Sequence, residues 1–107
     1  MIDCLNETKL IPLEQLNDAA ACLKVMAHPV RLRIVDILMQ GEYCVKEIAL
    51  MCNSREHQVC EHLRLMQNCG LLSSLRKGKA VYYKILSPQL PALLSCVQSH
   101  CNIAEGG

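Results

Sequence analysis

The sequence predicts a mainly α-helical domain with one two-stranded β-hairpin, in the order α-α-α-α-β-β-α. Two observations predict this fold class. Apolar residues recur at helical spacing in five segments, and the β-rich run Val81-Tyr82-Tyr83 follows a turn at Lys77-Gly78. With 107 residues, the chain is long enough for one domain and too short for two.

The first two helices are expected on either side of His28-Pro29. Residues 1–11 lack periodicity and predict a flexible arm, whereas Pro12 suits the first turn of a helix that runs to about Ala27. Pro29 can open the second helix, which Gly41 ends. The apolar stripes are Leu13, Leu16, Ala20, Leu23 and Ala27 in the first helix, and Val30, Ile34, Ile37 and Leu38 in the second.

The third and fourth helices are joined so tightly that they predict a helix-turn-helix. The third covers residues 45–51, and Asn53 stands where a left-handed turn residue is needed. Asn53 or Ser54 can cap the fourth helix, with Glu56 placed to complete a capping box on Asn53. The expected inward positions are Val45, Ile48, Ala49 and Cys52 in the third helix, and Val59, Leu63 and Met66 in the fourth.

The fourth helix, over residues 55–68, should leave His57, Cys60, Glu61 and Arg64 on its exposed face, and Gly70 should end it. Strands over residues 71–75 and 80–85 then form a hairpin, or wing, with Arg76, Lys77 and Lys79 at its tip. Residues 64–84 contain five basic and no acidic residues, although the whole chain has a net charge of only +1. Such a basic strip favours contact with nucleic acid, and an ordinary solvated surface is the alternative.

The last helix follows Pro88, and its apolar stripe predicts a homodimer. Little of the chain is left to cover this stripe or the stripe of the first helix, so a second copy is the expected partner. Packing within one chain is the alternative. The stripe consists of Leu90, Leu93, Leu94, Val97 and Cys101. The domain is expected to span residues 12–103, with residues 104–107 as a tail.

Composition excludes several classes of protein. No apolar run approaches the ~18 residues of a membrane span, and the N-terminus has no export signal, so no membrane partner and a cytoplasmic location are predicted. The eight cysteines are then expected to be reduced, buried, metal-binding or redox-active. No carboxylate pair, phosphate-cradling glycine loop or nucleophile with an assigned base is present, so the sequence does not predict an enzyme.

Five blocks of the sequence resemble the ArsR/SmtB family of bacterial repressors. The likeness covers Leu23 to about Leu86, and it depends on the joint occurrence of the blocks. They are Leu23-Lys24-Val25-Met26-Ala27-His28-Pro29-Val30-Arg31-Leu32-Arg33-Ile34, Gly41-Glu42-Tyr43-Cys44-Val45, Val59-Cys60-Glu61-His62-Leu63, Gly70-Leu71-Leu72 and Val81-Tyr82-Tyr83. The resemblance implies a dimeric winged helix-turn-helix that binds operator DNA and leaves it when an inducer binds.

The resemblance also implies which residues meet the duplex. The helix over residues 55–68 would enter the major groove, and the wing would reach the backbone or minor groove. The residues expected to contact DNA are Arg55, His57, Gln58, Cys60, Arg64, Arg76, Lys77 and Lys79. Glu61 departs from the basic or neutral residue common at its place, and it can repel phosphate or accept a hydrogen bond from cytosine.

The inducer is left open, because family members sense metals, metalloids or oxidants at unrelated places. Cys44 matches the first cysteine of a Cys-Val-Cys metalloid motif, but Lys46 occupies the second place. Cys4 of the arm can supply another thiolate, and soft thiolates suit arsenite, antimonite or soft metal ions. The alternative for Cys44 is a plain residue at a helix start. No obligatory cofactor is predicted.

A second candidate sensor lies on the last helix. Cys96 and His100 are one turn apart and Cys101 is adjacent, so the three can bind a metal across a dimer or form a disulfide. The family's zinc site is not expected there, because Ser87 and Gln89 stand in the places of its first two ligands. Packing at a dimer seam is the alternative role. Cys60 can also sense from the DNA-facing helix, although a simple replacement of serine is favoured.

The function predicted from the sequence is a repressor that binds double-stranded operator DNA as a homodimer. A thiol-directed inducer, either arsenite, antimonite or a soft metal ion, or oxidation or persulfidation of cysteine, would release it. The alternative is a winged-helix module that dimerises or recruits another protein without reading DNA. Glu61 and the nearly neutral net charge give that alternative mild support. The sequence names neither the operator nor the sensing cysteines.

Overall fold

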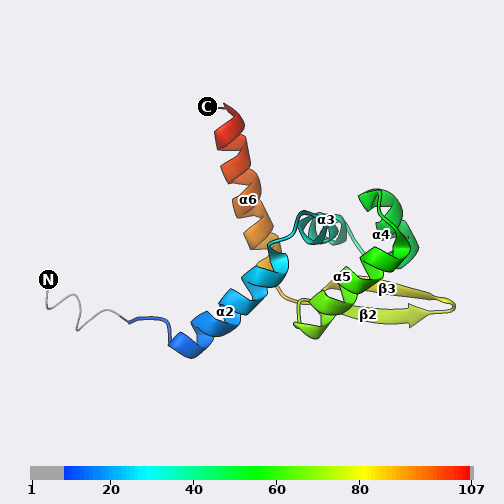
Figure 1. The fold of residues 1–107 in the computed structure, drawn as a ribbon, viewed down its shortest axis with the longest axis horizontal. Coiled ribbons are helices and arrows are strands. Elements are labelled where there is room, and N and C mark those ends of the chain that lie inside the picture. Colours follow the sequence, from blue (N-terminus) through cyan, green and yellow to red (C-terminus); the bar gives the residue numbers. More distant parts are fainter. Residues whose placement is uncertain (1–8, 107) are drawn as a thin grey trace, which may run out of the picture.

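The computed structural model describes residues 9–106, with side chains for residues 9–99. Within this part of the chain, five helices and three strands follow one another: α2 (Leu13–Met26), α3 (Pro29–Leu38), β1 (Tyr43–Cys44), α4 (Val45–Cys52), α5 (Glu56–Asn68), β2 (Leu72–Lys77), β3 (Ala80–Ile85) and α6 (Gln89–Gly106). Figure 1 shows α3, α4 and α5 grouped beside the hairpin, with α2 and α6 extending away from that group. The predicted mainly α fold with a wing is confirmed, and the short strand β1 was missed.

Helix α3 begins where the sequence predicts, at Pro29. His28 precedes it with extended backbone, and its Nδ1 accepts a hydrogen bond from the backbone N–H of Val30 at 3.1 Å. This bond satisfies one of the N–H groups that the first turn of a helix leaves without a partner. His28 is therefore the N-cap of α3, at the break between the two helices that the sequence predicts.

The turn between α4 and α5 depends on Asn53. Its φ of 52° and ψ of 43° are left-handed, as predicted, and its backbone N–H bonds back to the last turn of α4. The predicted capping box on Asn53 is wrong: Arg55 is the residue before α5, and no side chain caps this helix. The reason is that Asn53 already closes α4, while the Ser54 hydroxyl donates to the carbonyl of Cys52 at 3.2 Å.

The wing is part of a three-stranded antiparallel sheet with the order β1-β3-β2. Lys77 pairs with Ala80, so the two-residue connection is Gly78-Lys79 rather than the predicted Lys77-Gly78. Gly78 has a φ of 63°, which suits a residue without a Cβ. On the other edge, Tyr43 pairs with Tyr83 and Cys44 with Tyr82, which ties the start of α4 to the wing.

The core is aliphatic and lies between α3, α4, α5 and the sheet. The inward face predicted for α5 is confirmed, because Val59, Leu63 and Met66 are fully buried. Removing these side chains from water supplies most of the stabilisation, at about 25 cal/mol per Å² of apolar surface. The buried set is Met26, Ile34, Val35, Ile37, Leu38, Ile48, Ala49, Val59, Leu63, Met66, Leu71, Leu72, Tyr83 and Leu90.

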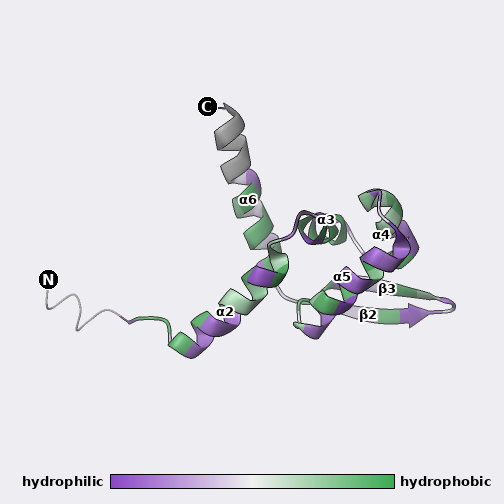
Figure 2. Cartoon of the chain, in the orientation of Figure 1, coloured by the Kyte–Doolittle hydropathy of each residue, from purple (hydrophilic) through white to green (hydrophobic). Residues whose placement is uncertain are grey.

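Helix α2 keeps much of its apolar surface exposed. Leu13, Leu16 and Leu23 are 72%, 45% and 52% exposed, and Met26 is the only buried residue of this helix. Figure 2 shows hydrophobic and hydrophilic residues alternating along α2, whose N-terminal part extends away from α4, α5 and the hairpin. Leu90 of α6 is buried, Leu93 and Leu94 are half-buried, and the side chain of Cys101 lies outside the described part.

Helix α6 runs to Gly106 and so extends through most of the stretch 104–107 that the sequence assigned to a tail. Residues 1–8, most of the predicted arm, lie outside the described residues. None of the described helices is long and apolar enough to cross a membrane.

Candidate nucleic-acid interface

Helix α5 buries Val59, Leu63 and Met66, so its opposite face points away from the core. His57, Cys60 and Arg64 line a groove of about 330 Å³ together with Val45, Glu56 and Glu61. Cys60 is half-buried there, and the other polar side chains are exposed. His57 Nε2 lies 3.2 Å from Glu61 Oε1, so Glu61 forms an ion pair with the imidazole when it is protonated. The structure thus brings three of the predicted contact residues to one groove.

Arg55 and Gln58 lie at the start of α5 and line a different groove of about 450 Å³. Ala49, Leu50, Asn53 and Ser54 complete its walls, so it lies over the helix-turn-helix connection. Both predicted contact residues are exposed. The polar groups on α5 therefore extend from the turn to the middle of the helix, which is an arrangement that can present donors to base edges and phosphates.

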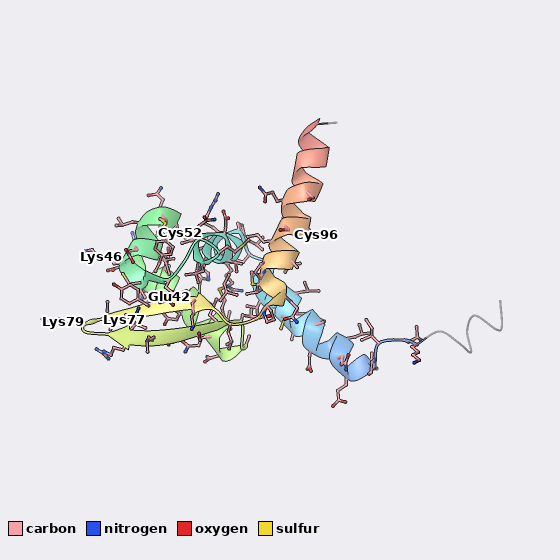
Figure 3. All side chains as sticks on the ribbon, turned by 180° about the vertical axis from the view of Figure 1, so that it is seen from behind. Glu42, Lys46, Cys52, Lys77, Lys79 and Cys96 are labelled. Atoms are coloured by element: carbon pink, nitrogen blue, oxygen red, sulfur yellow. The ribbon has the colours of Figure 1, made fainter. Side chains whose placement is uncertain are left out.

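The wing carries Arg76, Lys77 and Lys79, all exposed. Lys77 Nζ lies 3.4 Å from Glu42 Oε1 and 5.2 Å from the centre of the Tyr82 ring. Figure 3 shows Lys77 and Lys79 at the same end of the molecule as Lys46 of α4, far from Cys96. Sequence reasoning missed the contact of Glu42 with the wing. The only signal was an acidic residue just before a strand that had not been recognised.

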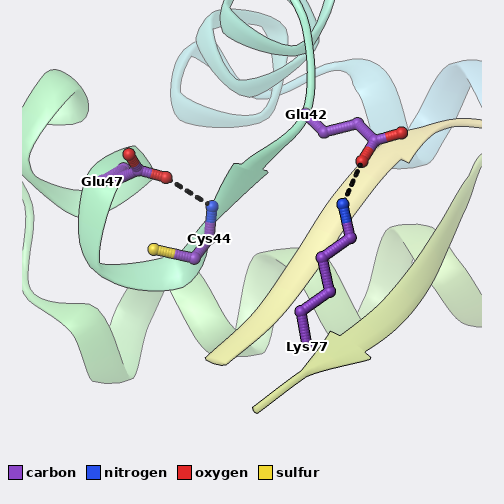
Figure 4. Close-up of polar contacts among 4 residues, drawn as sticks. All are labelled: Glu42, Cys44, Glu47 and Lys77. Atoms are coloured by element: carbon purple, nitrogen blue, oxygen red, sulfur yellow. Dashed lines mark hydrogen bonds and ion pairs between the residues drawn. The ribbon is translucent and has the colours of Figure 1, made fainter. Parts of the chain in front are cut away.

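Cys44 occupies the junction between β1 and α4, within a groove of about 370 Å³. Its walls are Cys44, Val45, Lys46, Glu56, Lys79, Ala80 and Val81. The backbone N–H of Cys44 donates to Glu47 Oε1 at 3.0 Å (Figure 4), and this hydrogen bond lowers the pKa of the Glu47 carboxyl. Half-buried Cys44 and the wing residue Lys79 line the same groove, which places Cys44 at the edge of the predicted DNA-facing surface.

The candidate sensor cysteines do not form one cluster in the described part of the chain. Cys44 and Cys60 line different grooves, and Cys96 is exposed on α6. Among the side chains of residues 9–99, no three histidine, cysteine, aspartate or glutamate residues gather closely enough to hold a metal ion. Cys4 and the side chains of His100 and Cys101 lie outside that part, so the pairings predicted for them stay predictions.

His62 of α5 takes part in contacts that link three helices. Its Nδ1 accepts a hydrogen bond from Arg31 Nε at 3.1 Å, and Arg31 also donates to the carbonyl of Val25 at 2.9 Å. The rings of His28 and His62 lie 4.7 Å apart. Burial, followed by the nearby His28 and Arg31, lowers the pKa of His62. This contact fixes α5 against α3 and the end of α2, and so sets the orientation of the outward face of α5.

Residues 28–74 match the family described as bacterial regulatory protein, arsR family. The arsenical resistance operon repressor of Escherichia coli K12 is 37% identical over 70 residues, which are 64% of this chain and 59% of that protein.

Two structures from Mycobacterium bovis are also similar. The crystal structure of a possible transcriptional regulatory protein (fragment 1–100) is 30% identical with a TM-score of 0.72, over 82% of this chain and 95% of that one. The solution structure of a homodimeric winged helix-turn-helix DNA-binding domain, a possible ArsR-family regulator, is 27% identical with a TM-score of 0.75, over 89% and 88%. The chain belongs to the ArsR/SmtB family of winged helix-turn-helix transcriptional repressors, which are DNA-binding proteins and not enzymes.

Proposed function

We propose that this protein represses transcription by binding an operator as a homodimer, and that a thiol-directed inducer releases it. The observation that carries the proposal is the polar and basic surface formed by the outward face of α5 and the wing. Arg55, Gln58 and Arg64 offer donors to base edges, while Arg76 and Lys79 offer charge to phosphates. The homodimeric M. bovis relative supports a two-fold arrangement of two such surfaces.

Operator binding can be tested by gel-shift titration of the reduced protein on the DNA upstream of its own gene. We expect saturable binding that weakens as salt increases, because phosphate contacts release counterions. Arg64→Ala and Lys79→Ala should weaken binding, whereas Arg33→Ala, an exposed cation on α3 outside the proposed DNA surface, should leave it unchanged. Absence of binding by the reduced protein at moderate salt would refute the repressor and leave the protein-interaction module, which Glu61 on the α5 face favours.

Thiol sensing is supported by the positions of Cys44 and Cys60. Each lines a groove on the surface proposed to meet DNA, so a metalloid, metal ion or oxidised sulfur at either place would change that surface directly. The E. coli relative is by name an arsenical resistance repressor, which makes arsenite the first inducer to test. Cys4 is the candidate second thiolate for Cys44, and Cys96, His100 and Cys101 form the alternative site on α6.

Metalloid binding and oxidation give different signatures on the reduced protein. Stoichiometric uptake of arsenite with ultraviolet thiolate absorbance supports the metalloid, whereas a disulfide or polysulfide after mild oxidant without metal uptake supports redox sensing. Each of five cysteines is then replaced singly by serine: Cys4, Cys44, Cys60, Cys96 and Cys101. A variant that still binds DNA but is no longer released by arsenite or oxidant identifies the sensing cysteine. If all five variants respond like the unchanged protein, none of these cysteines alone is the sensor.

A further inference from the structure

One of the three cations at the tip of the wing, Lys77, is already paired within the protein. Lys77 Nζ lies 3.4 Å from Glu42 Oε1, and the two side chains are 54% and 45% exposed. Neither Arg76 nor Lys79 forms an ion pair with any residue in the described part of the chain. Arg76 and Lys79 are therefore free to pair with an incoming phosphate, whereas Glu42 partly neutralises the charge of Lys77.

The backbone around Glu42 places its carboxylate beside the wing. Glu42 directly precedes β1, whose Tyr43 and Cys44 pair with Tyr83 and Tyr82 of β3. The Tyr82 ring also lies beneath the Lys77 ammonium group, at 5.2 Å from its centre. The other end of this strand is held by the hydrogen bond from the Cys44 N–H to Glu47 (Figure 4). The backbone that carries Glu42 is therefore anchored to the sheet beside Lys77.

We propose that Glu42 competes with the DNA backbone for Lys77, and so limits both the affinity of the wing for DNA and its dependence on salt. This inference rests on the proposed function. A phosphate that takes Lys77 must displace the carboxylate of Glu42, which then attracts a cation from solution. That uptake offsets one of the counterions that DNA releases. Glu42 is a positioning residue in this scheme, because it acts through Lys77 and not by contact with DNA.

The test compares two variants that each lose one exposed carboxylate from an ion pair. Glu42→Gln removes the competitor, and Asp36→Asn removes the partner of Arg33 on α3, where the two charges are 3.0 Å apart. Binding to a labelled duplex from upstream of the gene is measured at several salt concentrations. We expect Glu42→Gln to tighten binding about two- to five-fold at low salt, the equivalent of one exposed ion pair. The slope of log K against log salt should also steepen by up to about 0.9.

The control variant separates a local effect from a change in net charge, because Asp36→Asn raises the charge equally. A second control uses Lys77→Gln, which removes the cation that Glu42 pairs with. In a protein that already carries Lys77→Gln, adding Glu42→Gln should change DNA affinity no more than adding Asp36→Asn does. Equal behaviour of Glu42→Gln and Asp36→Asn, or weaker binding by Glu42→Gln, would overturn the inference. Failure of the unchanged protein to bind any duplex would instead refute the proposed function, so the two failures are distinguishable.

Discussion

Asn53 shows how one residue affects the geometry of the surface proposed to face DNA. Its left-handed backbone, at φ 52°, turns the chain so that α5 crosses α4 after only three residues. Residues with a Cβ usually pay about 1–2 kcal/mol for this conformation, whereas asparagine tolerates it and glycine has no such cost. The identity of this residue therefore affects both the stability of the domain and the placement of α5.

Replacing Asn53 by alanine or by glycine measures the energetic cost of the left-handed backbone. Asn53→Ala should lower the free energy of unfolding by about 1 kcal/mol, and Asn53→Gly should change it by only a few tenths. Urea denaturation at a fixed protein concentration measures both values, since a dimer unfolds with a concentration-dependent midpoint. Equal stability of the alanine and glycine variants would show that the backbone at this position is not left-handed in solution.

His62 should make stability depend on pH. Burial, His28 and Arg31 lower its pKa, while Glu61 raises it by less. The unfolded chain, with a pKa of about 6.5, therefore takes up the proton at a higher pH than the folded chain. The contribution of His62 is fully present above about pH 6.5 and is lost as the pH falls toward the folded value.

We expect the free energy of unfolding to decrease as the pH falls below about 6.5, because a protonated His62 no longer accepts the hydrogen bond from Arg31. His62→Gln keeps an acceptor at this place and removes the titration. The difference between the unchanged protein and this variant, followed by urea denaturation across the pH range, isolates His62 from the other histidines. A difference that does not vary with pH would contradict the prediction.

At the scale of single elements, α5 has one face buried in the core and one face exposed to solvent. Leu63 lies at the centre of the core and is fully buried, while Leu65 on the same helix is 37% exposed. Leu63→Ala should lower the free energy of unfolding by about 2–5 kcal/mol, because it leaves a cavity in packed surroundings. Leu65→Ala is the matched control and should cost roughly 0.5 kcal/mol or less. Denaturation curves of the two variants give the comparison, and similar costs would show that α5 packs on a different face.

The sequence correctly predicts the elements whose signals lie among neighbouring residues. The inward residues of α5, the start of α3 at Pro29 and the hairpin all follow from local spacing and turn chemistry. The strand β1 was missed because two residues show no alternation, and its partner is about forty positions away in the chain. The capping-box prediction was wrong because Asn53 is the left-handed C-cap of α4 and so does not cap α5.

The site is less predictable than the fold for a physical reason. The residues on α5 and the wing could be named, because a buried face determines the opposite exposed face. The pair of Glu42 and Lys77 joins positions 35 residues apart, and only the sheet brings them together. The proposed sensor would depend on contacts between thiols that can belong to two chains. Local spacing does not encode such contacts.

For the whole molecule, the positions of α2 and α6 outside the grouped elements bear on assembly (Figure 1). Leucine side chains exposed along α2 continue toward an apolar groove of about 320 Å³ between α2 and α6, lined by Cys22, Leu23, Met26, Leu71, Leu90 and Leu93 among others. Contiguous apolar surface of this kind is costly in water and is usually covered by a partner. A second copy is the partner that the homodimeric M. bovis relative suggests.

Leu16→Asp should therefore dissociate the proposed homodimer, because it places a charge within the apolar surface that two copies would cover. Leu75→Asp is the control, since Leu75 is also exposed but lies on β2 of the wing. Sedimentation velocity should give twice the mass of one chain for the unchanged protein and the control, and the mass of one chain for Leu16→Asp. The monomer should also lose operator affinity, because one chain presents only one recognition helix to two half-sites. A dimer that survives Leu16→Asp would place the interface elsewhere.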